Sequence, residues 1–281
     1  MKLPIYQVDA FASQLFSGNP AAVVVLESML DSRVMQAIAA ENNLSETAFI
    51  TPDANTYQIR WFTPSVEVDL CGHATLAAAH VVFNHLHYPQ ETVTFSSSKS
   101  GLLTVHQQDS HLYLNFPADI LKLVPVDDAI VATLTDALGT KILEVYRGRD
   151  DYLVIVAEED AIATLTPDMD CLKTVPARGI IVSASGTTID FVSRFFAPQS
   201  GIPEDPVTGS AHTTLVPYWS QKLGKMTLLA QQLSQRGGEL MCQNLGDRIE
   251  IGGTARTYLV GEIWMDGETS SSSPHDGLQC G

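Results

Sequence analysis

One short pattern occurs twice in the chain, and it constrains the fold more than any other feature of the sequence. The first copy ends at residues 71–75, Cys-Gly-His-Ala-Thr, and the second at residues 208–212, Thr-Gly-Ser-Ala-His. Upstream of each lies an aromatic residue, a proline two positions later and an acidic segment. The two turn glycines are separated by about half of the 281 residues. The pattern predicts an internal duplication into two similar domains with a small-molecule site in the cleft between them.

Each copy of the pattern also predicts the beginning of a helix. A glycine and a polar residue directly before an apolar run indicate a tight turn into a helix N-terminus. The first turn of a helix has unpaired backbone N–H groups at the positive end of the helix dipole, and these favour an anion. Two such ends facing one cleft would hold a carboxylate without a metal ion.

The composition excludes several function classes. A net charge of −16 argues against nucleic acid or an anionic membrane surface as a partner. No apolar stretch approaches the ~18–20 residues of a membrane span, and no phosphate-binding glycine motif occurs. The cysteines are scattered and predict a reducing compartment without a disulfide framework; they are Cys71, Cys171, Cys242 and Cys280. We therefore expect a cytoplasmic protein.

Hydrophobic periodicity predicts an α+β protein with two domains. The N-terminal half is expected over residues 1–117, and a strand from about 255–265 is a candidate to complete it. The C-terminal half is expected over 118–265, opening with a Pro-flanked linker at 118–126. Residues 266–281 are rich in serine and poor in apolar residues, which predicts a disordered tail.

Alternating and apolar runs predict the individual elements. Strands are expected at 5–11, 21–26, 44–50, 57–62, 92–95, 101–106, 111–117, 142–146, 152–156, 179–184, 189–196, 226–230, 239–243, 248–253 and 255–265. Helices are expected from Asp31 to Asn42, after each glycine turn, over 127–138 with Gly139 as the cap, and over 158–165. The Gly18–Pro20 segment is expected to form a hairpin-type loop between the first two strands.

Four side chains near the two turns are candidates for acid–base chemistry. His73 and Ser210 occupy the same position in the two copies, and either could instead cap its helix. Asp205 precedes the second turn and could instead order that turn through its own side chain. Glu46, at the start of a strand, could equally be an ordinary surface glutamate. Together these groups suggest that a proton is removed from and returned to a carbon next to a carboxylate.

Other polar residues have two interpretations as well. Cys71 lies directly before a helix N-terminus, where the pKa of a thiol tends to fall, or it is a small core residue. Asn19 either belongs to a plain turn or contacts a ligand. Three further histidines, His80, His85 and His87, follow the first turn without a carboxylate or thiol at ligand spacing, so we expect surface positions and no metal site.

Five motifs in register resemble the phenazine biosynthesis (PhzF-like) isomerase family. They lie at residues 8–11, 18–20, 45–49, 71–75 and 204–211, and the resemblance extends from residue 1 to about 265. It implies a diaminopimelate epimerase-like fold: two pseudo-symmetric halves, each a mostly antiparallel sheet rolled around a central helix, with the active site between them. It implies no cofactor, and a homodimer is common among such relatives.

The resemblance also implies roles for particular residues. Glu46 matches the glutamate that moves a proton across one face of an unsaturated cyclic amino acid in the founding enzyme of the family. The residues matching those that assist this transfer and orient the substrate are His73, Asp205 and Ser210. The substrate-binding candidates are Asn19, Cys71, Gly72, Thr208 and Gly209, and backbone groups around Gly72, Gly209 and Ser210 would hold the substrate carboxylate.

Two alternatives to this isomerase remain. Relatives that epimerise with two bases have a cysteine before each turn glycine, whereas here Cys71 fills the first position and Thr208 the second. A two-thiol racemase is therefore disfavoured, and Cys71 as a lone base is the first alternative. The second is a non-catalytic protein that only binds a small anion. The motifs do not name the substrate.

Overall fold

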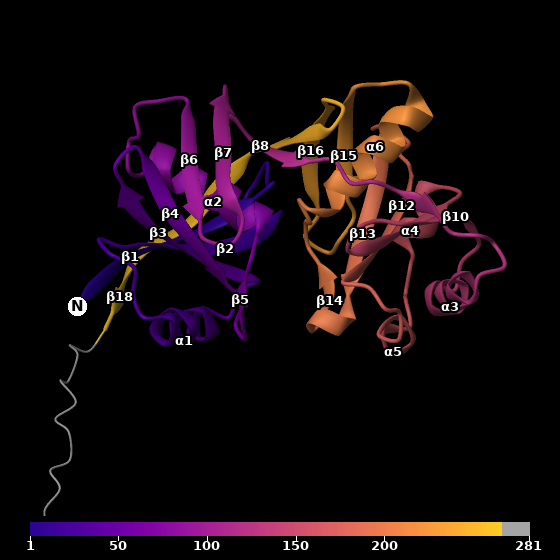
Figure 1. Ribbon diagram of the computed structural model, residues 1–281, viewed down its shortest axis with the longest axis horizontal. Helices are drawn as coiled ribbons and strands as arrows, with labels where there is room; N and C mark the ends of the chain where they lie inside the picture. The colour runs from indigo at the N-terminus through magenta and orange to yellow at the C-terminus, as the bar shows by residue number, and fades with distance from the viewer. Residues whose placement is uncertain (266–281) are drawn as a thin grey trace, which may run out of the picture.

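The computed structural model describes residues 1–265, which form two halves built from the same kinds of element (Figure 1). The first half contains β1 (Lys2–Ala10), β2 (Asn19–Val25), α1 (Ser32–Asn42), β3 (Glu46–Asp53), β4 (Thr56–Phe62), β5 (Glu67–Val68), α2 (Gly72–Asn84), β6 (Thr92–Ser97), β7 (Gly101–Gln108) and β8 (His111–Pro117). The following elements are β9 (Lys122–Leu123), α3 (Ala129–Leu138), β10 (Ile142–Arg147), β11 (Asp151–Val156), α4 (Glu159–Ala163), α5 (Met169–Leu172), β12 (Gly179–Ser185), β13 (Phe191–Ala197), a 3₁₀ turn (Pro198–Ser200), β14 (Ile202–Asp205), α6 (Ala211–Leu223), β15 (Thr227–Gln232), β16 (Gly238–Asn244), β17 (Arg248–Gly253) and β18 (Ala255–Trp264).

The two halves repeat one order of strand pairing. In the first half β1 and β2 are antiparallel, β2 and β3 parallel, and β3 and β4 antiparallel. The same order recurs for β10 with β11, β11 with β12, and β12 with β13. Next, β4 runs parallel to β6 with α2 between them in the chain, and β13 runs parallel to β15 with α6 between them. The prediction of an α+β fold with mostly antiparallel pairing is confirmed.

Each half also receives a strand from the chain segment that leaves the other half. The last long strands of the halves, β8 and β17, pair with each other and join the two sheets. The chain leaving β17 forms β18, which runs beside β1 across the first half (Figure 1), and the short β9 that follows β8 pairs with β10. The two halves are therefore tied by backbone hydrogen bonds rather than by a single linker.

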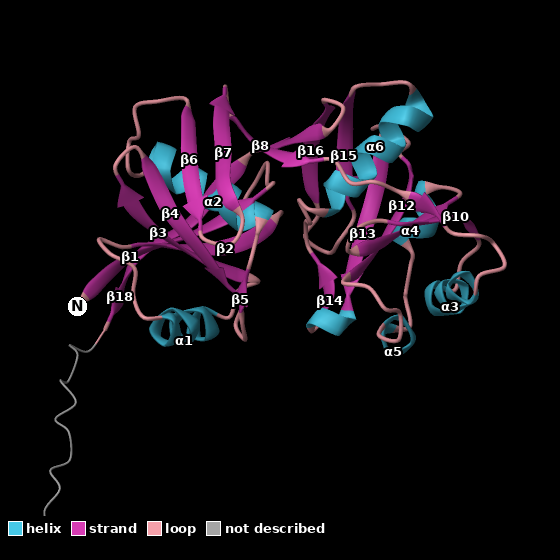
Figure 2. Ribbon diagram, in the orientation of Figure 1, coloured by secondary structure: helices cyan, strands magenta, loops and turns pink. Residues whose placement is uncertain are grey.

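A largely buried helix passes through each half, as Figure 2 shows for α2 and α6. In α2 the run from His73 to Ala79 is buried on every side of the helix, which its small and apolar side chains permit. In α6 the Trp219 ring stacks on Phe191 of β13 at a centroid distance of 5.7 Å. By contrast α1, α3 and α5 lie outside the strands (Figure 2). The core of each half thus forms around the helix that begins at the repeated turn.

A proline inside α6 connects this helix to the segment after β8. Pro217 has no N–H group to donate to the carbonyl of Thr213, four residues earlier. The backbone N–H of Asp119 donates to that carbonyl instead, at 3.1 Å, and the Thr214 hydroxyl donates to the Asp119 carboxylate at 2.9 Å. The helix break that proline would otherwise favour is compensated by a tertiary contact.

Several local predictions are confirmed and one is corrected. Asp31 caps α1 by accepting a hydrogen bond from the Arg33 backbone, and Gly139 ends α3 with a φ of 62°. Asn19 was expected in a loop, but it opens β2 and pairs with Ala10. The short elements β5, β9, β14 and α5 were not predicted, because segments of two to four residues depend on tertiary pairing more than on local pattern. The predicted disordered tail lies outside the described residues.

The expectation that the histidines of α2 lie at the surface is wrong for two of them. His80 and His85 are half-buried, and both Nε2 atoms approach the Thr257 hydroxyl of β18, at 2.9 and 2.8 Å. Burial, together with the charge of His85, lowers the pKa of His80 to about 4. Only His87 is exposed.

Within residues 1–265, none of the helices has the length and apolar character needed to cross a bilayer.

Candidate active site

The beginnings of α2 and α6 meet where the two halves join. A methyl group placed on Gly72 would lie 3.8 Å from the Cα of Gly209, so the two backbones approach closely. The cap residues are Cys71 and Ser210, and neither side chain makes a capping hydrogen bond. The first three N–H groups of α6 instead donate to the backbone carbonyls of residues 208–210. Among residues 1–265, no acceptor is found for the N–H groups of Gly72, His73, Gly209 and Ser210, so these are the groups open to an anion. The duplication predicted from the sequence brings both turns to one place.

Glu46 and His73 form a close pair at this junction. Glu46 opens β3, and its Oε2 lies 3.0 Å from Nε2 of His73 in the first turn of α2. The side chains are only 13% and 7% exposed. The contact lacks hydrogen-bond geometry, and among residues 1–265 this buried Oε2 has no hydrogen-bond donor. A carboxylate of this kind retains the capacity to accept a proton.

The other ring nitrogen of His73 faces two groups of opposite character. Its Nδ1 lies 3.2 Å from Nδ2 of Asn19, which can only donate, and 3.5 Å from the Cys71 sulfur, which can accept. Burial disfavours the charged ring, but the Cys71 sulfur and the Glu46 carboxylate outweigh it and raise the pKa of His73 well above its ordinary value. The Asn19 amide has only two hydrogens, and its shorter contacts to Asp205 and Val207 use both. The partner left for Nδ1 is therefore the Cys71 sulfur, to which a hydrogen on Nδ1 can donate.

Asn19 connects His73 to the second half. Its Nδ2 donates to Oδ1 of Asp205 at 2.9 Å and to the Val207 carbonyl at 2.8 Å. The Thr208 hydroxyl donates to the other oxygen of Asp205. Burial raises the pKa of Asp205, whereas the charge of His73 and the hydrogen bonds from Thr208 and Asn19 oppose that rise. Glu46, His73, Asn19, Asp205 and Thr208 therefore form one continuous cluster.

Gln232, a residue that the sequence analysis missed, supports the second turn. Its Oε1 accepts from the backbone N–H of Thr208 at 2.8 Å, and its Nε2 donates to the backbone carbonyl of Asp205 at 2.8 Å. Gln232 is fully buried at the end of β15. No motif surrounds it, so the sequence contained no signal for this role.

Ser210 contacts a second missed residue, Arg178. Nη1 of Arg178 donates to the Ser210 hydroxyl oxygen at 3.0 Å, so the hydroxyl does not cap α6. Nε of Arg178 donates to the buried carboxylate of Asp151 at 2.9 Å. Arg178 lies between a short helix and a strand, and a single arginine there carries no recognisable pattern. Only the folded chain brings it to the second turn.

Cys71 is buried beside His73 rather than exposed at the helix end. Burial, with the Glu46 charge adding to it, raises the pKa of the thiol, and the influence of His73 only partly offsets this. Glu46, Cys71 and His73 each place one ligand atom within 4.8 Å of the others, so among residues 1–265 this trio could hold a metal ion. The absence of a metal site stays a prediction.

Cys71 should resist alkylation in the native protein. It is 7% exposed and its thiolate is disfavoured, and Cys242 is also buried, with a raised pKa. Half-buried Cys171 is the internal control. After iodoacetamide treatment at pH 7.5, peptide mass spectrometry should find Cys171 modified before Cys71 and Cys242. Preferential modification of Cys71 would show a reactive thiol and contradict this assignment.

Buried His212 should make the free energy of unfolding depend on pH. It is fully buried, its Nδ1 lies 2.9 Å from the Thr208 carbonyl, and burial lowers its pKa to about 4. The unfolded side chain titrates near 6.5, so the unfolded state binds more protons between these two pKa values. Stability is fully present above pH 6.5 and falls as the pH decreases towards 4, by up to about 3 kcal/mol.

Urea unfolding at pH 7 and pH 5 tests this expectation. His212→Leu should lose less stability on acidification than the wild type, whereas His87→Gln, a change at an exposed histidine, should retain the wild-type pH dependence. An equal loss in wild type and His212→Leu would show that His212 does not remain neutral in the folded protein.

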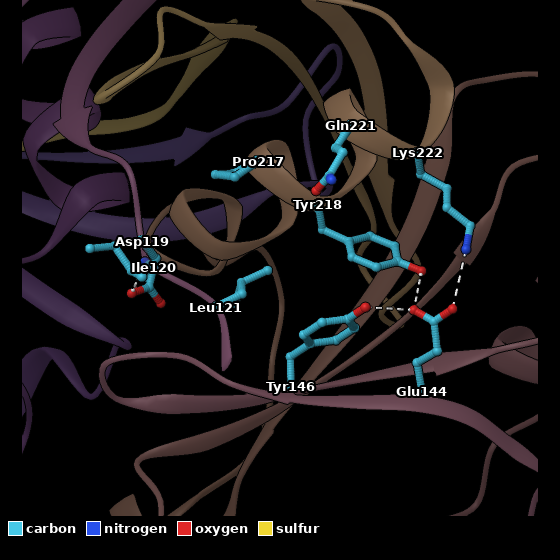
Figure 3. Close-up of a pocket in the computed structure, with 9 residues that line it drawn as sticks. All are labelled: Asp119, Ile120, Leu121, Glu144, Tyr146, Pro217, Tyr218, Gln221 and Lys222. Carbon is cyan, nitrogen blue, oxygen red and sulfur yellow. Dashed lines mark hydrogen bonds and ion pairs between the residues drawn. The ribbon is translucent and has the colours of Figure 1, made fainter. Parts of the chain in front are cut away.

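A pocket of about 640 Å³ lies elsewhere, beside the C-terminal part of α6 (Figure 3). The Glu144 carboxylate in this pocket accepts hydrogen bonds from the hydroxyls of Tyr146 and Tyr218, at 2.9 and 3.1 Å, and pairs with Lys222 at 3.2 Å. These polar groups satisfy one another. None of the predicted site residues lines this pocket.

Comparison with known proteins decides the family. Residues 8–261 match the family model described as phenazine biosynthesis-like protein. The chain belongs to this PhzF family. An uncharacterized isomerase of Pseudomonas aeruginosa is 50% identical over 263 residues, which cover 94% of this chain and 99% of that protein. A PhzF family crystal structure from Enterococcus faecalis has 48% identity and a TM-score of 0.90, covering 94% of this chain and all of that one.

Family membership confirms the fold and the enzyme class. The chain is an isomerase of the PhzF family. A hydroxyproline epimerase from Agrobacterium vitis shares only 10% identity but has a TM-score of 0.62 over 95% of this chain, which shows a common fold. The prediction of a diaminopimelate epimerase-like fold is therefore confirmed. The roles of individual site residues stay predictions.

Proposed function

We propose that this PhzF-family isomerase transfers a proton within a small metabolite that bears a carboxylate, with Glu46 as the acid and base. The observation that supports this most directly is the Glu46 carboxylate 3.0 Å from the His73 ring, at the place where α2 and α6 begin. An acid–base group and two anion-binding helix ends thus share one location.

The chemistry follows from this arrangement. Backbone N–H groups of Gly72 and His73 at the start of α2, and of Gly209 and Ser210 just before α6, would bind the substrate carboxylate. They would stabilise negative charge as a neighbouring carbon loses its proton. Glu46 would take that proton and return it to another carbon of the same molecule, so the overall composition is unchanged. His73, whose ring lies between the Glu46 carboxylate and the Cys71 sulfur, would adjust its charge while Glu46 gains and loses the proton. Asp205 and Asn19 would keep the ring in place.

A Cys71-based epimerase is the second candidate, because the Cys71 sulfur lies 3.5 Å from Nδ1 of His73. Its opposite position is filled by Thr208, whose hydroxyl already donates to Asp205. A hydroxyl in that setting is a poor second base. The geometry therefore favours Glu46. A homodimer and independence from cofactors remain predictions.

Solvent exchange tests the proposed function. The protein is incubated in deuterated water with amino acids and unsaturated cyclic carboxylates, and NMR follows deuterium at the carbons near the carboxylate. We expect exchange or isomerisation of a carboxylate-bearing compound that persists in Cys71→Ser. Exchange lost in Cys71→Ser but retained in Glu46→Gln would assign the base to the thiol and overturn the proposal. An absence of exchange with every compound would argue for the non-catalytic alternative.

A further inference from the structure

The duplication gives the repeated strands and turns of one half counterparts in the other. Phe62 of β4 corresponds to Phe196 of β13, since each precedes its acidic segment and turn by a similar distance. Phe62 pairs with Thr47 in the β3–β4 ladder, and Phe196 pairs with Ile180 in the β12–β13 ladder. Glu46 and Gly179, each one residue earlier, therefore occupy equivalent positions. Arg178 directly precedes that counterpart. The position of the acidic side chain in the first half is thus occupied by glycine in the second, and a basic residue directly precedes that glycine.

The contacts at the two positions are also related. In the first half Glu46 lies 3.0 Å from His73. The counterpart of His73 is Ser210, and the Arg178 guanidinium lies 3.0 Å from its hydroxyl. The first half therefore presents a carboxylate and an imidazole at the junction, whereas the second presents a guanidinium and a hydroxyl. A substrate bound between them would meet a proton acceptor on one side and hydrogen-bond donors on the other.

The contact with Arg178 determines what the Ser210 hydroxyl can do. A guanidinium has only donors, so the serine oxygen accepts from it and keeps its own hydrogen for another acceptor. No acceptor for that hydrogen occurs within the part of the chain that the structure describes, and the side chain does not cap α6. Ser210 is thereby oriented as a donor beside the first turn of the helix.

Arg178 is held firmly yet stays accessible. Two of its nitrogens donate to the carboxylate of Asp151, whose side chain is 4% exposed, and the guanidinium lies 5.5 Å from the ring centroid of Phe195. The Arg178 side chain itself is 41% exposed. Asp205 lies across from Phe195 in the β13–β14 pair, and its charge is among those that raise the pKa of Arg178.

We propose that Arg178, anchored by Asp151, is a positioning residue that makes the Ser210 hydroxyl a donor to the substrate carboxylate. The carboxylate would then lie at the N-terminus of α6, and the reacting carbon would face Glu46. This inference rests on the proposed function, and it adds the orientation of the substrate and the residue that sets it. A charged carboxylate should be preferred over a neutral amide of the same shape.

Titration with sodium acetate, followed by amide NMR of the full chain, tests the inference. In the wild type we expect saturable shifts at Gly209, Ser210 and neighbouring amides, and none with acetamide. Ser210→Ala should weaken acetate binding about 10- to 150-fold, the range for losing a hydrogen bond to a charged group. Arg178→Gln should weaken it to a similar degree, and the combined variant should bind no more weakly than either single variant, because both remove one contact.

Two further variants keep this test interpretable. Arg178→Gln leaves the buried Asp151 carboxylate without its partner, so it is also made together with Asp151→Asn, which removes the unpaired charge. Arg60→Gln is the matched control: Arg60 pairs with Glu67 at 2.7 Å and lies 5.1 Å from the Phe62 ring, but it does not contact the site. Acetate affinity should be unchanged in Arg60→Gln.

Three results would overturn the inference. The first is an acetate affinity that does not change in the Arg178 variants. The second is a combined variant in which the losses of the two single variants multiply. The third is a wild type whose acetate shifts are absent or confined to the first turn of α2. Glu46→Gln separates this outcome from failure of the proposed function, because it should still bind acetate in a way that depends on Arg178 while losing proton exchange. Acetate binding that depends on Arg178 without proton exchange would contradict only the proposed function.

Discussion

Replacing Glu46 with glutamine is expected to reduce the rate constant kcat by about 10²- to 10⁴-fold, the usual contribution of a general acid–base group. Glutamine has the same shape but cannot take up a proton at neutral pH. Glutamine also keeps a side-chain oxygen or amide near Nε2 of His73, so the buried ring loses a neighbouring charge but not its neighbour. KM should change little, because the helix ends and not Glu46 would bind the carboxylate.

The measurement is the rate of deuterium incorporation or isomerisation for the compound identified by the exchange screen. Glu41→Gln makes the same chemical change on the exposed surface of α1 and should keep the wild-type rate. Circular dichroism confirms that Glu46→Gln is folded. A folded Glu46→Gln protein with a rate within about threefold of the wild type would remove Glu46 from the mechanism.

Replacing Gly18 with alanine is expected to lower the free energy of unfolding by about 2–5 kcal/mol. Gly18 has a φ of 68°, which side chains with a Cβ adopt at a cost of roughly 1–2 kcal/mol. The added methyl group would also collide with the Ala10 carbonyl oxygen and lie 2.8 Å from the Ala12 side chain. Because Gly18 directly precedes Asn19, the displacement should disturb the link between His73 and Asp205 as well.

Gly139→Ala separates the two contributions. Gly139 has a similar φ of 62°, but a methyl group there would meet nothing within 4 Å. Its substitution should cost only the roughly 1–2 kcal/mol of the backbone conformation. Urea unfolding of both variants gives the comparison. Equal losses would mean that the backbone near Gly18 can move away from the added methyl group, and that Asn19 is not held as tightly as its contacts suggest.

Much of the fold could be predicted from local sequence. The alternating strands, the Asp31 cap of α1 and the glycine after α3 appear close to where the pattern places them, because periodicity and capping act over a few residues. The repeated turn predicted both central helices and their meeting point. Short elements such as β5 and β9 were missed, because two residues form a strand only when a distant partner is present.

The candidate site divides in the same way. Glu46, His73 and Asp205 lie in motifs that could be found along the chain, and the structure brings them into one cluster with Asn19. Arg178 and Gln232 belong to no motif. They reach the second turn because β11–β12 and β13–β15 pair side by side, which depends on the register of the sheet. Their roles depend on contacts between residues that are far apart in sequence.

The sequence by itself determined the duplication, the α+β class, the two helix beginnings and the acid–base candidates. Each of these depends on the types and spacing of residues within short segments of the chain. Only the tertiary structure decided that the Ser210 hydroxyl does not cap α6 but accepts from Arg178, and that Cys71 is a buried thiol beside His73. The physical reason is that burial and hydrogen-bond partners depend on which segments pack together. A side chain acquires its charge state and its role from those neighbours.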